Sequence, residues 1–303
     1  MKRAFRTTIP VLLFALLFLH CKEDVAVDFS DFTPKLVVNA QLTPAASFAF
    51  SIAESVSPVS DEPGRIPEGL QLQLTDLTLD LEISLYPEND LYIAPQIYPR
   101  PGHTYRIEAS APGFATVHGV TTIPRHQAVR TISVKNALVE PSSETEGKSN
   151  VSYDLEVILD TDHGRYLHLT FWQVTRLNVG TVEAPDFEEF IYAVMPEFPE
   201  EDGFRKHHEL GLLIDRTVLP EPERLSFTFR DYTINQFEEL GDLIIEVRTT
   251  SPGYYRYFDS LARQLVSRQD PLAEPIPTYN NIESGLGNFS SFDYKQYRTD
   301  LFQ

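Results

Sequence analysis

The stretch that decides the fold class is Leu70–Thr75, which reads LQLQLT, together with Leu79–Leu85, which reads LDLEISL. In both runs an apolar residue alternates with a polar one. Successive side chains of a β-strand point to opposite faces, so this period of two is typical of a strand with one buried and one solvated face. The two runs therefore predict strands of a half-buried antiparallel sheet.

The same pattern continues on both sides of this stretch, from residue 35 to residue 125. Leu36–Leu42 is expected to form the first strand, and turn residues such as Pro101-Gly102 and Pro112-Gly113 separate later ones. Seven short strands in about ninety residues, without a helical stretch, are typical of an immunoglobulin-like or fibronectin-like β-sandwich. We therefore predict such a sandwich over residues 35–125.

The remainder of the chain, residues 126–303, is predicted to be a second β-rich domain. Its expected strands are 129–134, 153–159, 165–174, 225–229 and 243–247. Turn-forming residues, 160–164, separate the second strand from the third and predict that these two pair as a hairpin. The sequence does not assign the segment between Leu177 and Arg224.

One helix is predicted, over residues 252–268 of this second domain. Ser251 is a suitable N-cap, and Pro252 fits the first turn, where its missing N–H costs nothing. Apolar residues then recur at spacings of three and four, namely Tyr254, Tyr257, Phe258, Leu261 and Leu265. Such a stripe makes the helix amphipathic, and we interpret it as core packing rather than as a ligand-binding face.

The composition excludes one class of partner. The chain has 303 residues, of which 42% are hydrophobic, enough for a sizeable core. Its 44 acidic and 25 basic residues give a net charge of −19. A nucleic-acid phosphate backbone favours a basic surface, so no nucleic-acid partner is expected.

Residues 1–20 are typical of a signal peptide. Lys2, Arg3 and Arg6 precede an apolar run of eleven residues, Ile9–Leu19. At 1.5 Å per residue this run is too short for a hydrocarbon core of about 30 Å, so it predicts a signal segment and not a membrane span. No later stretch approaches eighteen apolar residues.

The cysteine that follows, Cys21, is the single cysteine of the sequence. Its position after Leu17-Phe18-Leu19-His20 resembles a bacterial lipobox, although His20 replaces the usual small residue. We therefore expect Cys21 to be lipidated and residues 21–34 to form a tether, with a plain cleaved signal as the alternative. Lys22-Glu23-Asp24 is either a solvated charged run or, as it resembles, the surface-export signal of Bacteroidota lipoproteins.

Strong catalytic and cofactor motifs are absent from the sequence: there is no G-x-S-x-G, no H-E-x-x-H and no P-loop. We therefore expect no catalytic residues, no cofactor and no enzyme activity. His207 and His208 would point to opposite faces of a strand, so no zinc site is expected. Asp160 and Asp162 begin like a calcium loop, but Phe171 stands where the pattern needs an acidic residue.

The acidic segment 183–202 leaves two interpretations open. It holds eight acidic residues and no Lys or Arg. Several carboxylates together are able to hold calcium, but a solvated negative loop is the more common reason for such a run.

The C-terminal stretch is the most distinctive part of the sequence. It combines Tyr254–Leu261 (YYRYFDSL), Asp270–Pro275 (DPLAEP) and Asn280–Phe289 (NNIESGLGNF). With Leu36–Ala40 (LVVNA) and the Gly102-x-x-Tyr105-x-Ile107 segment, these motifs resemble a Bacteroidota lipoprotein family known as domain of unknown function 4249. Read from the residues alone, Gly285 and Gly287 favour a packed terminal turn over a phosphate site.

The resemblance covers essentially the whole chain after the signal peptide. It implies no assigned activity, and it implies a neighbourhood with TonB-dependent outer-membrane receptors. We therefore expect a non-catalytic lipoprotein, anchored by lipid in the outer membrane and facing the cell surface, that assists such a transporter or captures its ligand. The alternatives are a secreted hydrolase with an unrecognised acidic site and an adhesion or envelope-architecture protein.

Overall fold

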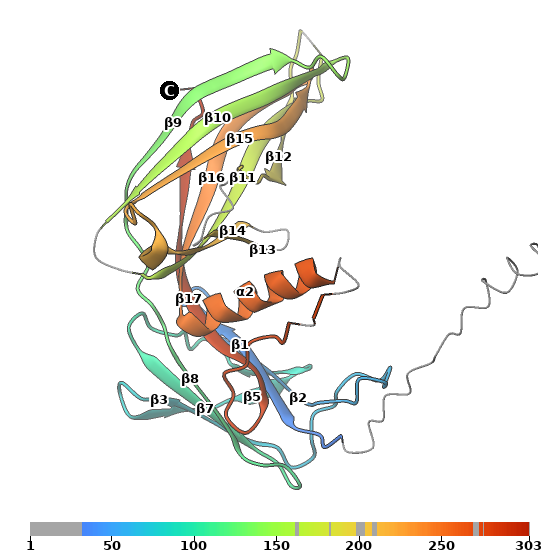
Figure 1. Ribbon diagram of the computed structural model, residues 1–303, viewed down its shortest axis with the longest axis vertical. Helices are drawn as coiled ribbons and strands as arrows, with labels where there is room; N and C mark the ends of the chain where they lie inside the picture. The colour runs from blue at the N-terminus through green and yellow to red at the C-terminus, as the bar shows by residue number, and fades with distance from the viewer. Residues whose placement is uncertain are drawn as a thin grey trace, which may run out of the picture. The chain divides into compact units, whose positions relative to one another are not determined.

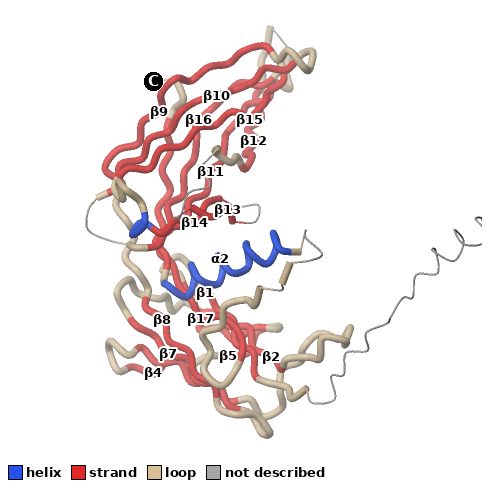
Figure 2. Tube along the Cα trace, in the orientation of Figure 1, coloured by secondary structure: helices blue, strands red, loops and turns tan. Residues whose placement is uncertain are grey.

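The computed structural model describes residues 32–160, 164–181, 183–197, 204–207, 211–268, 273–274 and 276–302. All helices and strands in these ranges belong to one compact unit, residues 34–56 and 60–303. The fold is mostly β, as the sequence predicts, and the described residues contain a single α-helix (Figures 1 and 2).

Eight strands precede residue 123: β1 (Leu36–Leu42), β2 (Phe48–Glu54), β3 (Gln71–Asp76), β4 (Leu81–Ile83), β5 (Tyr86–Glu88), β6 (Leu91–Ala94), β7 (Thr104–Ser110) and β8 (Val117–Thr122). A four-stranded antiparallel sheet has the order β4-β3-β7-β8. Its inner face shares a hydrophobic core with β1 and β2, in which Phe48, Phe50 and Leu74 are fully buried. The predicted sandwich-like arrangement of strands is thereby confirmed.

The two alternating runs, Leu70–Thr75 and Leu79–Leu85, differ in how far they form the predicted strands. Leu74 lies in the core, with Leu72 partly buried beside it, as alternation predicts. The second run forms only the three residues of β4, and Leu79 and Leu81 are about half exposed, at 50% and 54%. The reason is a turn before β4, which the Asp76 carboxylate closes by accepting the backbone N–H groups of Thr78 and Leu79.

The later elements are β9 (Val129–Pro141), β10 (Lys148–Leu159), β11 (Tyr166–Asn178), β12 (Phe187–Ala193), β13 (Phe204–His207), β14 (Gly211–Asp215), the 3-10 turn η1 (Arg216–Val218), β15 (Arg224–Asn235), β16 (Glu238–Thr250), α2 (Pro252–Ser267) and β17 (Leu286–Thr299). A three-stranded sheet has the order β15-β10-β9. It shares a second core with β11, β14 and β16, where the Phe229 ring contacts both Tyr153 and Phe171.

The predicted hairpin across residues 160–164 is wrong. β10 pairs with β9 and β15, whereas β11 pairs with β12, β14 and β16. The chain crosses here from one sheet to the sheet facing it. Asp160 belongs to the first sheet, because its backbone N–H bonds the carbonyl of Ala128 and its carboxylate accepts from Arg130. Turn-forming residues mark such a crossing as readily as a hairpin.

Strand β17 takes part in both halves of the large sheet, whose order is β13-β14-β11-β16-β17-β1-β2-β6-β5 with β12 also paired to β11. Leu286–Ser291 pairs with β1 in parallel, and Phe292–Thr299 pairs antiparallel with β16. Phe289 is buried in the first core, and Tyr297 packs against the second. The last strand of the chain therefore links strands that lie about 200 residues apart in sequence.

Helix α2 begins at Pro252 and ends at Ser267, as predicted to within one residue. Ser251 is its N-cap, and the Ser251 hydroxyl accepts the backbone N–H of Tyr254 at 3.3 Å. Of the predicted stripe, Tyr254 is the fully buried member, in contact with Phe258 and Phe292. The other four residues of the stripe are only partly buried, so core packing is observed at Tyr254 and not along the whole stripe.

Candidate functional site

The residues predicted to anchor the protein, Cys21 with Lys22, Glu23 and Asp24, lie outside the described residues, as does the signal peptide 1–20. In the described part of the chain, no helix is both long and apolar enough to span a bilayer. The anchor therefore remains a prediction from sequence.

The histidines and carboxylates singled out from sequence do not assemble a metal centre within the described ranges, which contain no group of three His, Cys, Asp or Glu side chains suited to an ion. His163, Asp162 and His208 lie outside those ranges. His168 is buried, and its Nδ1 lies 2.8 Å from the Tyr254 hydroxyl. It joins β11 to α2 rather than facing solvent.

Part of the acidic segment 183–202 is a strand, where the sequence assigned nothing. β12 pairs residue by residue with β11, from Trp172↔Ala193 to Asn178↔Phe187. One of its carboxylates, that of Glu189, forms an ion pair with Arg176 at 3.3 Å. Residues 198–202 of the segment are outside the described ranges.

The terminal motif Asn280–Phe289 is a packed turn. The Asn281 side chain accepts the backbone N–H of Phe289 and donates to its carbonyl, both at 2.8 Å. Gly287 has a φ of +118°, and a Cβ there would lie 2.1 Å from the carbonyl oxygen of Val38. Glycine is needed at this position so that β17 approaches β1 closely enough to pair with it.

A pocket of about 440 Å³ lies where the end of β16 leads into α2. We call it the arginine-rimmed pocket. Three segments line it: the end of β8 with the link that follows, the start of β11, and the end of β16 with the first turn of α2. The lining residues are Thr122, Pro124, Arg125, Gly164, Arg165, Tyr166, Thr249, Thr250, Ser251, Pro252 and Arg256. Its volume falls in the usual range for small-molecule sites.

Hydrogen bonds between Ser251, a lining residue, and Ser291 hold the pocket in place. The backbone N–H of Ser251 donates to the carbonyl of Ser291 at 2.8 Å, and its hydroxyl accepts the Ser291 N–H at 3.0 Å. The Ser291 hydroxyl in turn donates to the carbonyl of Thr122 at 2.7 Å. The first turn of α2, β17 and the end of β8 are therefore held together around the pocket.

Behind the pocket lies a buried cation. Arg216, 7% exposed, donates to the Gln127 side chain at 2.8 Å and to the carbonyl of Gly164, a lining residue, at 3.2 Å. Burial lowers the pKa of Arg216 from its ordinary value, but not enough to discharge a guanidinium at neutral pH. The carboxylate of Glu223 acts in the opposite direction and raises this pKa.

The rim carries three exposed arginines. Arg165 pairs with Asp215 at 3.1 Å and lies 4.8 Å from the Tyr166 ring centre. Arg256 lies 5.7 Å from the ring centre of Tyr279, and a hydrogen bond with that tyrosine raises the pKa of Arg256. Within the described ranges, no carboxylate lies within ion-pair distance of Arg125 or Arg256.

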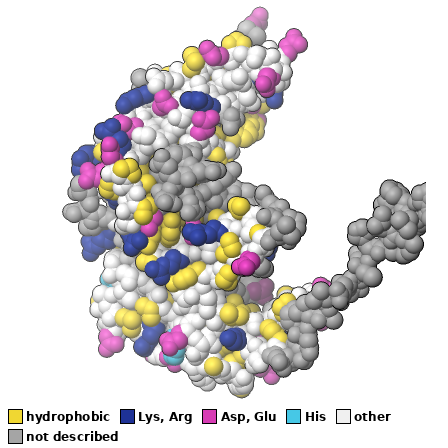
Figure 3. All heavy atoms as spheres, in the orientation of Figure 1, with side chains coloured by type: hydrophobic (Ala, Val, Ile, Leu, Met, Phe, Trp, Pro, Cys, Tyr) yellow, Lys and Arg dark blue, Asp and Glu magenta, His cyan; other side chains and the backbone are white. Residues whose placement is uncertain are grey.

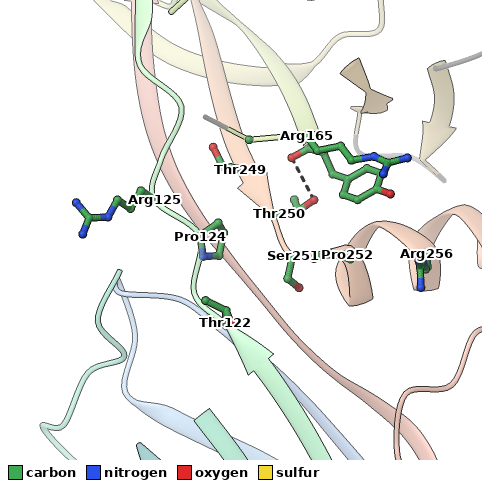
Figure 4. Close-up of a pocket in the computed structure, with 11 residues that line it drawn as sticks. Thr122, Pro124, Arg125, Arg165, Thr249, Thr250, Ser251, Pro252 and Arg256 are labelled. Carbon is green, nitrogen blue, oxygen red and sulfur yellow. Dashed lines mark hydrogen bonds between the residues drawn. The ribbon is translucent and has the colours of Figure 1, made fainter. Parts of the chain in front are cut away.

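Figure 4 shows the arrangement of these side chains. Arg125 and Arg165 stand on opposite sides of the pocket, and their guanidinium groups point outward from the row of hydroxyls formed by Thr249, Thr250 and Ser251. Figure 3 shows further Lys and Arg side chains over α2, beside exposed hydrophobic ones. The rim is therefore a set of long, exposed cations around a hydroxyl-lined hollow.

The chemistry of the described lining suits binding. It contains hydroxyls, guanidinium groups and a tyrosine, and neither a carboxylate nor a histidine. Guanidinium groups bind carboxylates and phosphates through paired hydrogen bonds, and they do not lose a proton at physiological pH. The described lining therefore favours an anion.

Sequence reasoning missed this pocket. Arg125, Arg165 and Arg256 lie far apart in the chain. Their segments are brought together by the pairing of β11 with β16 and by the hydrogen bonds of Ser291 to Ser251 and Thr122. The single local signal was the cap Ser251-Pro252, which predicted where α2 begins but not what surrounds its first turn.

Comparisons with known proteins give one family. The family described as "Domain of unknown function (DUF4249)" matches residues 22–298. No match was found among curated proteins. A solved structure, "Enterococcal surface protein, partial N-terminal region", aligns with 8% identity over 71% of this chain and 88% of that chain, at a TM-score of 0.15. A likeness at that TM-score carries no argument about fold or function.

Proposed function

Because the chain belongs to the DUF4249 family, whose description assigns no activity, we propose its function from its own residues. It is a non-catalytic, lipid-anchored protein of the outer membrane, facing the cell surface, which captures a small anionic ligand for a TonB-dependent transporter. The observation that carries the ligand-capture part is the arginine-rimmed pocket in a chain whose net charge is −19.

The net negative charge of the chain makes the pocket stand out as a place where an anion is attracted. Most of the surface of a protein with 44 acidic residues repels anions. Arg165 is paired with Asp215, but Arg125 and Arg256 form no ion pair within the described ranges, and these two arginines are a local reversal of that sign. An anion that carries an apolar part would place its charge at Arg256 and Arg125 and its apolar part against Pro124 and Tyr166.

The anchor and the partner rest on the sequence. Cys21 after an apolar run of eleven residues supports lipidation, and Lys22-Glu23-Asp24 supports export to the surface. The transporter partner is supported by the family resemblance alone. A pull-down of the tagged full chain from outer membranes in mild detergent tests it, and recovery of no transporter would count against this part of the proposal.

The ligand-capture part is tested with the full chain in detergent and a panel of small anions: phosphate, citrate, benzoate and a sugar phosphate. Titration calorimetry is expected to find binding of at least one anion. The double change Arg125→Gln with Arg256→Gln is expected to weaken it about a hundredfold, since hydrogen bonds to charged groups contribute about 1.5–3 kcal/mol each.

A matched variant separates the pocket from general surface charge. Arg106 is an exposed arginine on β7, outside the pocket. Arg106→Gln is expected to leave anion binding unchanged. Equal weakening by Arg106→Gln and by the pocket variant contradicts the proposed site.

A further inference from the structure

Strand β12 is an edge strand with an unusual degree of exposure. All seven of its residues, Phe187–Ala193, are exposed, and its register with β11 runs without a shift. Figure 1 shows it beside β11, and no other described strand pairs with it. One long side of β12 is therefore open in the described part of the chain.

The hydrogen bonds that flank β12 show which backbone groups face the open side. Val194 donates its N–H to the carbonyl of Phe171, and the carbonyl of Asp186 accepts the N–H of Val179. In an antiparallel pair, residues that bond the partner alternate with residues that bond outward. The even-numbered residues therefore bond β11, and the N–H and C=O groups of Phe187, Glu189, Ile191 and Ala193 face away from it.

The sequence of β12 protects this edge weakly, through the charged side chains of Glu188 and Glu189 alone. Proteins block edge strands with lysine, proline, a bulge or very short length. β12 has seven residues in regular register, and its sequence FEEFIYA contains neither lysine nor proline. A long, regular edge with so little protection is a template for another strand.

Exposed apolar side chains continue the edge into a patch, which we call the β12 patch. On β12 the exposed fractions are 39% for Phe187, 36% for Phe190, 60% for Ile191 and 42% for Tyr192. Val179, at 48%, and Phe237, at 61%, adjoin the start of the strand, because Asn178 pairs with Phe187 and its N–H donates to the Phe237 carbonyl. Contiguous exposed aromatic surface marks interaction sites.

The charges beside the patch select the partner. From residue 183 to 197 the chain has five acidic residues, Glu183, Asp186, Glu188, Glu189 and Glu197, and no basic one. Arg176 pairs with Glu189 and Arg230 pairs with Glu197, which leaves the strand with the uncompensated charge of Glu188. A second copy of the chain would bring two such segments together, whereas a basic strand would neutralise them.

We propose that β12 is a docking strand for an extended, basic segment of a partner protein, which adds to the sheet at the open edge. The backbone groups of Phe187, Glu189, Ile191 and Ala193 bond the added strand. Its apolar side chains lie beside Phe187 and Ile191, on one face, and its basic side chains lie beside Glu188, on the other. This surface is separate from the arginine-rimmed pocket, whose ligand plays no part in it.

The probe for this proposal is a blocked seven-residue peptide in which lysine alternates with valine, added to the purified full chain. Its control is the same peptide with glutamate in place of lysine. Fluorescence anisotropy is expected to show saturable binding of the lysine peptide, weaker at high salt, and none of the glutamate peptide. Equal binding of both peptides, or binding of neither, overturns the proposal.

Two variants at one position separate backbone pairing from apolar contact. Ile191→Pro removes an outward N–H and keeps the β11 bonds, so it is expected to weaken lysine-peptide binding about tenfold or more. Ile191→Thr keeps that N–H and is expected to weaken binding less. Equal effects of the two changes show that the strand does not pair through its backbone.

A third variant keeps the proposal testable if Ile191→Pro does not fold. Glu188→Lys changes an exposed side chain and is expected to reverse the preference, so that the glutamate peptide binds better than the lysine peptide.

Sedimentation of the unmodified chain gives a further test. A dimer that Ile191→Pro dissociates identifies a second copy as the occupant and overturns the basic partner.

Discussion

Ser251 and Ser291 are joined by two reciprocal hydrogen bonds, from the Ser251 N–H to the Ser291 carbonyl and from the Ser291 N–H to the Ser251 hydroxyl. The same Ser251 hydroxyl caps α2 by accepting the Tyr254 N–H. Ser291 is the last residue of β17 that pairs with β1, before Phe292 begins the pairing with β16. The helix therefore starts where the strand changes partner.

Removing the Ser251 hydroxyl is expected to destabilise the fold. Ser251→Ala loses the helix cap, which contributes about 1 kcal/mol, and leaves the buried Ser291 N–H without its acceptor. We expect a loss of about 2–3 kcal/mol in the free energy of unfolding, measured by denaturant titration. Ser267→Ala, at the other end of α2, should change it by no more than about 0.5 kcal/mol, and similar losses from both changes would rule out the special role of Ser251.

Gly287 is expected to be the glycine least tolerant of substitution. Gly287→Ala places a Cβ against the Val38 carbonyl and forces alanine to a φ of +118°, so pairing of β17 with β1 must loosen. Gly113 has a φ of +85° and open space around it, so Gly113→Ala has the conformational cost alone. Thermal unfolding should show a loss of about 1 kcal/mol for Gly113→Ala and at least about 3 kcal/mol for Gly287→Ala.

Because the Asp76 carboxylate closes the turn before β4, we expect the stability of the fold to depend on pH. Burial raises the pKa of this carboxyl, but hydrogen bonds from His103, Thr78 and Leu79 outweigh burial and hold the pKa below its ordinary value of 3.8. The stabilisation is therefore complete above about pH 5 and is lost as the pH falls through 3.8 and then through the lower folded-state pKa.

Asp76→Asn tests this dependence. The variant is expected to be less stable than the unmodified chain at pH 7, by about 1–3 kcal/mol, and to lose less stability between pH 5 and pH 3. Asp80→Asn, at an exposed turn position next to the same strand, should leave the pH profile unchanged. Parallel profiles for Asp76→Asn and the unmodified chain contradict the assignment.

Local pattern predicted the elements of this fold better than their partners. The start of α2 followed from Ser251-Pro252, and Leu74 is buried as its alternating run predicts. The partner of β10 did not follow, because turn residues at 160–164 do not say whether the chain returns along the same sheet or crosses to the facing one. Strand β12 was missed because both of its faces are exposed. Its apolar and acidic residues therefore do not alternate as they do in a half-buried strand.

The candidate site was beyond local pattern for a related reason. The segments that carry Arg125, Arg165 and Arg256 are brought together by long-range strand pairs, and nothing near any of these arginines marks it as different from the other basic residues. By contrast, Gly287 was predicted to lie in a packed turn, although the strand that requires a glycine there, β1, is distant in the sequence.

The anchor is tested by Cys21→Ala. Burying the chains of a lipidated cysteine contributes about 0.8 kcal/mol per CH₂, far more than the marginal binding of a single acyl chain. The variant is expected to leave the membrane fraction and to retain its far-ultraviolet circular dichroism and unfolding temperature, because Cys21 precedes β1 by fifteen residues. A variant that stays with the membrane shows that something other than the lipid holds it there.

Surface display is a separate prediction, carried by Lys22, Glu23 and Asp24. Replacing all three by alanine leaves Cys21 and the preceding apolar run unchanged, so the triple variant is expected to remain in the membrane fraction but to lose exposure to the outside. Protease added to whole cells should cleave the unmodified protein and spare the triple variant, while both are cleaved after lysis. If the unmodified protein is also spared in whole cells, it faces the periplasm, and the three charged residues are a solvated tether.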